Sequence, residues 1–182
     1  QIKGKIKFIA GLVTIFLAIE VYAVLDQALE MINTSGKISG GALKGLTANR
    51  NITAFSIAVK IPFLFYFLYS VKKEQYKFFG SVLFTLSLIS LSMIQSRASL
   101  LATFFAILVF IIINIFMFFK VEKHKKYWVL IAYTIVPVIF TLFVNQVYLA
   151  DKGADVVSRA ASIVEVTTDD SITARIRYYS HV

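Results

Sequence analysis

The sequence contains no cysteine, two prolines and two histidines. Without cysteine, the chain has no disulfide, no thiolate nucleophile and no cysteine-ligated metal. His124 and His181 are too far apart in the sequence to indicate a metal-binding pair. The chain also lacks a Gly-x-y repeat and any Gln/Asn-rich tract, which excludes fibrous and low-complexity classes.

Apolar residues dominate the sequence. Apolar residues occupy 58% of the 182 positions, and the mean hydropathy is +0.77. Globular chains contain about 45–50% apolar residues. A water-soluble fold of this size could not bury the excess, so we expect an integral membrane domain.

Five segments are long enough to cross a bilayer, because a membrane helix needs about 20 mostly apolar residues. The predicted spans are 6–25, 52–70, 78–94, 98–119 and 127–148. We therefore predict an all-α, polytopic transmembrane helical bundle over residues 1–148, with an outer loop at 26–51. Residues 149–182 would begin a large loop on the same side.

The third and fourth spans should form a tight hairpin. Residues 78–119 are mostly apolar, and the consecutive polar residues Gln95, Ser96 and Arg97 interrupt them near the middle. The run is about twice one bilayer crossing, so this polar triplet must be the turn. Arg97 would then lie at a membrane face.

The charges predict the orientation of the spans. One side of the membrane would carry ten lysines and two acids, a net charge of +8, whereas the other would carry eight cations and seven acids, a net of +1. Positively charged loops remain in the cytoplasm. We expect a multi-pass protein of the bacterial inner membrane with its long loops in the periplasm. Nucleic acid is not an expected partner, because the lysines lie in short loops beside the spans.

Lysine and arginine are distributed differently in this topology. Ten of the fourteen lysines face the cytoplasm, whereas all five arginines lie on the outer side. A guanidinium group binds phosphate through two parallel hydrogen bonds, whereas lysine acts as a hydrated point charge. An anionic ligand on the outer side would explain the difference; chance combined with headgroup snorkelling is the alternative. The five arginines are Arg50, Arg97, Arg159, Arg175 and Arg177.

Arg50 lies in a polar run, 45–54, that leads directly into a span. Asn49 or Asn51 could cap the helix, and free N–H groups at a helix start also attract anions. A plain helix cap and a binding role are equally compatible with this pattern.

Two charged residues lie inside predicted spans. At 1.5 Å per residue, Lys60 lies about 12 Å and Glu20 about 8 Å below the outer ends of their spans. Intramembrane charges are usually paired or line a water-filled path. We favour a Glu20–Lys60 pair over a lysine in a substrate cavity. Pro62 should kink the second span.

The outer segments have three features. Four glycines within 26–51 indicate an irregular, mobile loop. Apolar residues at helical spacing in 154–166 predict a helix that lies on the membrane face or packs onto the protein. Arg175 and Arg177 precede Tyr178 and Tyr179, whose rings could stack on a sugar.

Several of these residues form a pattern shared with a known family. In chain order they are Asn49, Asn51, Ala54, Pro62, Ser96, Arg97, Ala98, Ser171 and Arg175. Their order, spacing and common outward side resemble the O-antigen ligase and O-antigen polymerase superfamily. The resemblance covers most of the chain.

The resemblance implies a membrane glycosyltransferase of lipopolysaccharide biosynthesis. Such an enzyme moves glycan from an undecaprenyl-pyrophosphate carrier to lipid A core, as a ligase, or to a growing polysaccharide, as a polymerase. Arg97 and Arg175 would hold the pyrophosphate, Asn49 and Asn51 would shape the site, and Ser96, Arg50 and Arg177 would complete it. No metal or other cofactor is implied.

The family's proposed catalytic histidine lies deeper in the outer loop, and His181 follows the arginines too closely to be that residue. The chain opens at Gln1 and closes just past a charged stretch. We therefore expect a fragment that lacks a complete active site.

Two other functions fit the same pattern. A transporter or flippase of lipid-linked oligosaccharide would also place charged groups within spans. A noncatalytic membrane assembly subunit would use the spans only for packing. The first predicts movement without bond formation, and the second predicts that changes to arginine have no effect.

Overall fold

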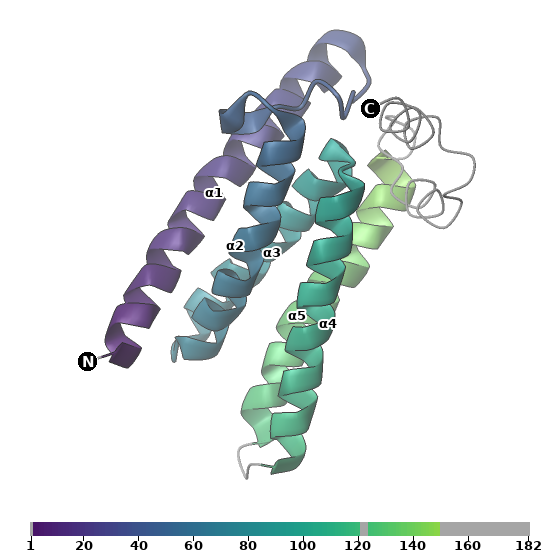
Figure 1. The fold of residues 1–182 in the computed structure, drawn as a ribbon. Coiled ribbons are helices and arrows are strands. Elements are labelled where there is room, and N and C mark those ends of the chain that lie inside the picture. Colours follow the sequence, from purple (N-terminus) through teal and green to yellow (C-terminus); the bar gives the residue numbers. More distant parts are fainter. Residues whose placement is uncertain (1, 121–123, 150–182) are drawn as a thin grey trace, which may run out of the picture.

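The computed structural model describes residues 2–120 and 124–149, which contain helices and connecting segments but no strand (Figure 1). A 3-10 turn, η1, and a π-helical turn, η2, accompany five long helices. The elements are α1 (Ile2–Ser35), η1 (Gly45–Thr47), α2 (Arg50–Ser70), α3 (Glu74–Ile94), α4 (Arg97–Lys120), α5 (His124–Val144) and η2 (Asn145–Leu149).

The structure is an all-α bundle with five helices long and apolar enough to cross a membrane, which confirms the predicted fold class. The candidate spans are Gly4–Ser35, Arg50–Ser70, Glu74–Ile94, Arg97–Lys120 and Lys126–Leu149. All five predicted spans overlap these helices. The chain is therefore a candidate multi-pass membrane protein.

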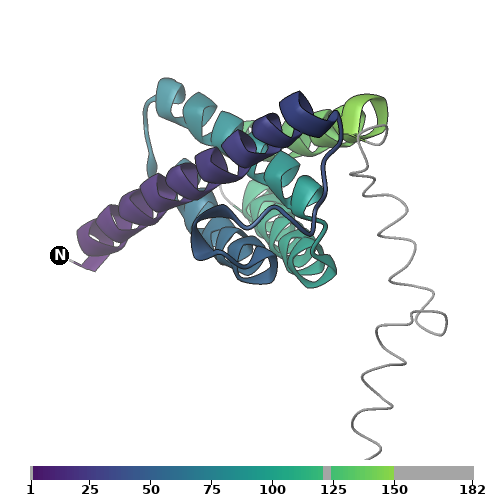
Figure 2. The same ribbon diagram turned by 90° about the horizontal axis from the view of Figure 1, so that it is seen from above.

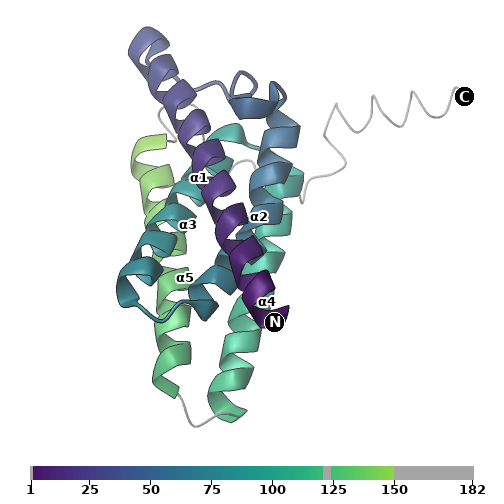
Figure 3. The same cartoon turned by 90° about the vertical axis from the view of Figure 1, so that its left-hand side faces the viewer.

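The helices pack around α2 and α3. Helix α1 contacts both of them, whereas α4 packs against α2 and α5, and α5 also packs against α3. Seen from above, α1 lies across one side of the group formed by the other helices (Figure 2). The view in Figure 3 shows α1 crossing in front of α2 and α3.

The turn between α3 and α4 is as short as predicted, but the two helices do not form a packed hairpin. Helix α3 ends at Ile94 and α4 begins at Arg97. Gln95 has a left-handed backbone conformation, φ 57° and ψ 36°, which redirects the chain. The helices then diverge, and each packs mainly against α2 or α5.

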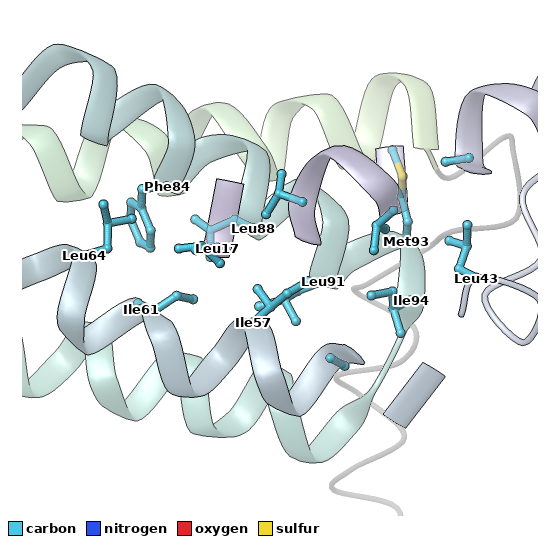
Figure 4. Close-up of a cluster of buried hydrophobic side chains, with 14 of the residues drawn as sticks. Leu17, Leu43, Ile57, Ile61, Leu64, Phe84, Leu88, Leu91, Met93 and Ile94 are labelled. Carbon is cyan, nitrogen blue, oxygen red and sulfur yellow. The ribbon is translucent and has the colours of Figure 1, made fainter. Parts of the chain in front are cut away.

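The core lies between α1, α2 and α3. Large side chains with almost no exposed surface meet there, among them Leu17, Ile57, Ile61, Phe84 and Leu91 (Figure 4). The outer faces of the bundle are also apolar, which suits contact with lipid rather than water.

Small residues allow α3 to approach its neighbours closely. A methyl group on Gly80 would lie 2.6 Å from Leu68 Cδ2 of α2. Ser87 and Ser90 are fully buried, and their hydroxyls donate to the carbonyls of Leu83 and Leu86 one helical turn earlier. Small residues of this kind are typical of membrane helix interfaces.

The structure corrects the predicted loop at 26–51. Helix α1 continues to Ser35, so the first part of that segment is helical. Residues 26–35 contain neither glycine nor proline, and Ala28, Leu29, Glu30 and Met31 favour a helix. Gly36, with φ 69°, ends α1, as glycine commonly does at a helix C-terminus.

The remaining 36–49 segment packs on the end of the bundle. Ile38 and Leu43 are buried. Gln27 of α1 holds the segment, because its Oε1 accepts from the backbone N–H groups of Lys44 at 3.1 Å and Gly45 at 3.0 Å. The segment is thus tied to α1 by both apolar and polar contacts.

Gly40 provides the closest contact of the 36–49 segment with α3. A methyl group at Gly40 would lie 2.8 Å from the Met93 carbonyl oxygen and 3.1 Å from that of Ile94. The same group at Gly41 would lie 3.6 Å from Arg50 Nη1, an ordinary contact.

We therefore expect Gly40→Ala to destabilise the protein by about 1–3 kcal/mol through overpacking against backbone. Gly41→Ala should change stability by less than about 0.5 kcal/mol. Thermal unfolding of the purified full-length protein in detergent measures both. Equal stability of the two variants would contradict the close packing of Gly40.

Candidate functional site

Asn49 caps the start of α2. Its side-chain oxygen accepts from the backbone N–H of Asn51 at 3.0 Å and from that of Ile52 at 3.4 Å. Thr47 supports this cap, because its hydroxyl donates to the Asn49 carbonyl at 2.9 Å and pairs with the Thr53 hydroxyl at 2.7 Å. The cap that the sequence allowed is present, so a binding role for Asn49 would be additional to a structural one.

Arg50 is the first residue of α2 and is exposed, as is Asn51. The helix macrodipole places partial positive charge at this end, so an arginine here has no stabilising interaction with the dipole. An anion placed beside Arg50 would be attracted by both the guanidinium and the helix terminus.

Arg97 occupies the corresponding position at the start of α4. The Leu100 N–H donates to the Ser96 carbonyl at 3.0 Å, and the hydroxyls of Ser96 and Ser99 are 3.2 Å apart. Arg97 is half-buried, in contrast to the exposed Arg50. Its position at a bundle end agrees with the predicted turn.

Gly40 and Gly41 link these two helix starts. A methyl group on Gly40 would lie 3.4 Å from Gln95 Cγ in the α3–α4 turn, and one on Gly41 would lie beside Arg50. The 36–49 segment therefore connects Arg50 with the turn that carries Ser96 and Arg97. Figure 1 shows both helix starts at the same end of the bundle.

Three of the outer arginines lie outside the described residues, as does the helix expected at 154–166. They are Arg159, Arg175 and Arg177. The candidate site in the described chain consists of the two helix starts and the 36–49 segment between them.

Below this end, Lys60 of α2 forms an ion pair with Glu20 of α1. Lys60 Nζ lies 2.7 Å from Glu20 Oε2, and the side chains are 20% and 9% exposed. Glu20 lies seven residues before Gln27 in α1, and Lys60 lies ten residues after Arg50, the first residue of α2. At 1.5 Å per residue the pair is therefore about 10–15 Å below the bundle end.

Ser56 completes this cluster and was not anticipated from the sequence. Its hydroxyl donates to Glu20 Oε1 at 2.7 Å and accepts from Lys60 Nζ. Ser56 and Lys60 are four residues apart, and side chains at this spacing share a helix face. The four-residue spacing of Ser56 and Lys60 is the sequence feature that could have indicated their contact.

At the bundle end, Arg50 and Arg97 supply positive charge that attracts an anion. Below them, Glu20 and Lys60 form an ion pair. Among residues 2–120 and 124–149, no group of three His, Cys, Asp or Glu residues could hold a metal ion. Comparisons of the chain with protein-family models, with curated proteins and with solved structures found no match.

We expect removal of either charge of the Glu20–Lys60 pair to destabilise the bundle. Glu20→Gln or Lys60→Met would leave one buried charge without its partner, at a cost of about 3–5 kcal/mol. The double variant should recover most of that loss, because it leaves no unpaired charge. Ser56→Ala, as a matched control, should cost about 1 kcal/mol.

A double-mutant cycle of thermal unfolding in detergent measures these effects. Losses that simply add in the double variant would contradict a direct interaction between Glu20 and Lys60.

Proposed function

We propose that this chain is part of a membrane glycosyltransferase that binds a lipid-linked oligosaccharide through its pyrophosphate. The observation that carries the proposal is the placement of Arg50 and Arg97 as the first residues of two helices at one end of the bundle. The 36–49 segment lies against Arg50 at the start of α2 and against Gln95 in the turn that precedes α4.

Phosphate chemistry supports this assignment. Two guanidinium groups supply fixed positive charge and directed N–H donors, and two helix N-termini add partial positive charge. A pyrophosphate beside them would be attracted both by the guanidinium charges and by the positive ends of the helix dipoles. The sugar-phosphate bond would lie at the membrane face, where a polyprenyl carrier holds it.

The charge distribution supports an outward position for this end. The opposite end carries Lys5, Lys7, Lys72, Lys73 and Lys120, and positively charged loops are retained in the cytoplasm. We infer that Arg50 and Arg97 face the periplasm and that the protein lies in the bacterial inner membrane.

In the proposed reaction, an acceptor hydroxyl oxygen attacks the anomeric carbon of the glycan. The bond from that carbon to the carrier pyrophosphate breaks as the new glycosidic bond forms. Arginines that hold the pyrophosphate stabilise the charge that develops on it. A base must accept the hydroxyl proton.

We expect Arg97→Lys in the full-length protein to lower glycan transfer about 10²- to 10³-fold, because lysine keeps the charge but cannot form two parallel hydrogen bonds. Membrane insertion should be unchanged. The assay incubates purified protein with lipid-linked oligosaccharide and candidate acceptors and follows the products. A ladder indicates a polymerase, and transfer of one block indicates a ligase.

Lys120→Arg, at the opposite end, is the matched control and should transfer normally. Unchanged transfer by Arg97→Lys would reject the pyrophosphate role. Transbilayer movement of the substrate without product would instead indicate a flippase, and arginine variants without any effect would indicate an assembly subunit.

A further inference from the structure

Three lysines surround one hollow at the end of the bundle opposite Arg50 and Arg97. Lys7 comes from the first turns of α1, and Lys72 and Lys73 come from the link between α2 and α3. The hollow has a volume of about 340 Å³. Segments 65 residues apart in the sequence therefore bring their cations to one place.

The three lysines have no acidic partner in the part of the chain that the structure describes. All three are exposed. The nearest acid in the sequence, Glu74, is engaged elsewhere, because its Oε1 lies 2.6 Å from Nζ of Lys77. No carboxylate lines the hollow, so its rim is positively charged.

The rest of the hollow is apolar or aromatic. Val71 is buried, Phe67 is half-buried, and Tyr76 lies beside Lys73, whose Nζ is 6.0 Å from the ring centroid. Helix α2 ends at Ser70 and α3 begins at Glu74, so the hollow lies where the spans reach the membrane face. Cations at this depth above an apolar wall match a ligand that is anionic at one end and apolar at the other.

We propose that this hollow binds an anionic phospholipid, with its phosphate among Lys7, Lys72 and Lys73 and its acyl chains along Phe67 and Val71. Basic pockets between membrane helices bind anionic lipid headgroups through the same combination. Free phosphate would use the lysines but not the apolar wall.

If the three lysines served only to orient the spans in the membrane, they would not need to line the same hollow. Lys120 provides the comparison, because it is exposed at the same end of the bundle but does not line the hollow. The inference is independent of the proposed function, since it concerns the other end of the bundle.

The test uses the purified full-length protein in neutral phosphatidylcholine vesicles, titrated with fluorescent phosphatidylglycerol. Lys7→Gln, Lys72→Gln and Lys73→Gln should each weaken lipid binding about fivefold, as expected for one interfacial lysine. Lys120→Gln should leave binding unchanged. Circular dichroism of each variant checks that the helices are intact.

Equal weakening by all four variants would indicate diffuse attraction to the membrane surface and would overturn the proposal. So would unchanged binding in the three hollow variants. A second arm adds inorganic phosphate at constant ionic strength: the proposal expects the lipid to remain bound, and its displacement would show a site for free anions instead.

Discussion

The hydrocarbon interior of a membrane supplies no hydrogen-bond partners, and this constraint determines where the charged residues of the chain can lie. Glu20 and Lys60, well inside their helices, satisfy one another with the help of Ser56. Their contact fixes the level of α1 against α2. About two helical turns nearer the bundle end, Gln27 of α1 meets the 36–49 segment, which in turn reaches the α3–α4 turn through Gly40. The Glu20–Lys60 pair thus helps to position the candidate site, although neither residue is part of that site.

Arginine and lysine are distributed unevenly between the two ends of the bundle. Arg50 and Arg97 begin helices at one end, where planar guanidinium groups suit a phosphate held by directed hydrogen bonds. Lysines gather at the other end, where hydrated point charges suit a mobile lipid headgroup. In our account one end binds a substrate and the other binds the surrounding membrane, so the same net positive charge serves two purposes.

Features set by length and burial could be predicted from the sequence. The five spans followed from apolar length, the turn at Gln95–Ser96 from the polar triplet near the middle of a run two crossings long, and the Glu20–Lys60 contact from depth. Features set by tertiary contact could not. The divergence of α3 and α4 and the contacts of Ser56 depend on how helices pack after insertion, which apolar length does not encode. The extension of α1 beyond residue 25 has a local cause instead: residues 26–35 favour a helix that Gly36 ends, but they are too polar to count toward an apolar span.

Orientation is the claim on which the proposed function depends, and the absence of native cysteine allows a direct test. Ala98 is exposed in the first turn of α4, and Lys120 is exposed at its other end. Single-cysteine variants Ala98→Cys and Lys120→Cys would be labelled in intact cells with a membrane-impermeant maleimide. Our account predicts that Ala98→Cys is labelled from the periplasmic side and that Lys120→Cys is labelled only after the inner membrane is opened. The reverse pattern would place Arg97 in the cytoplasm and contradict the account.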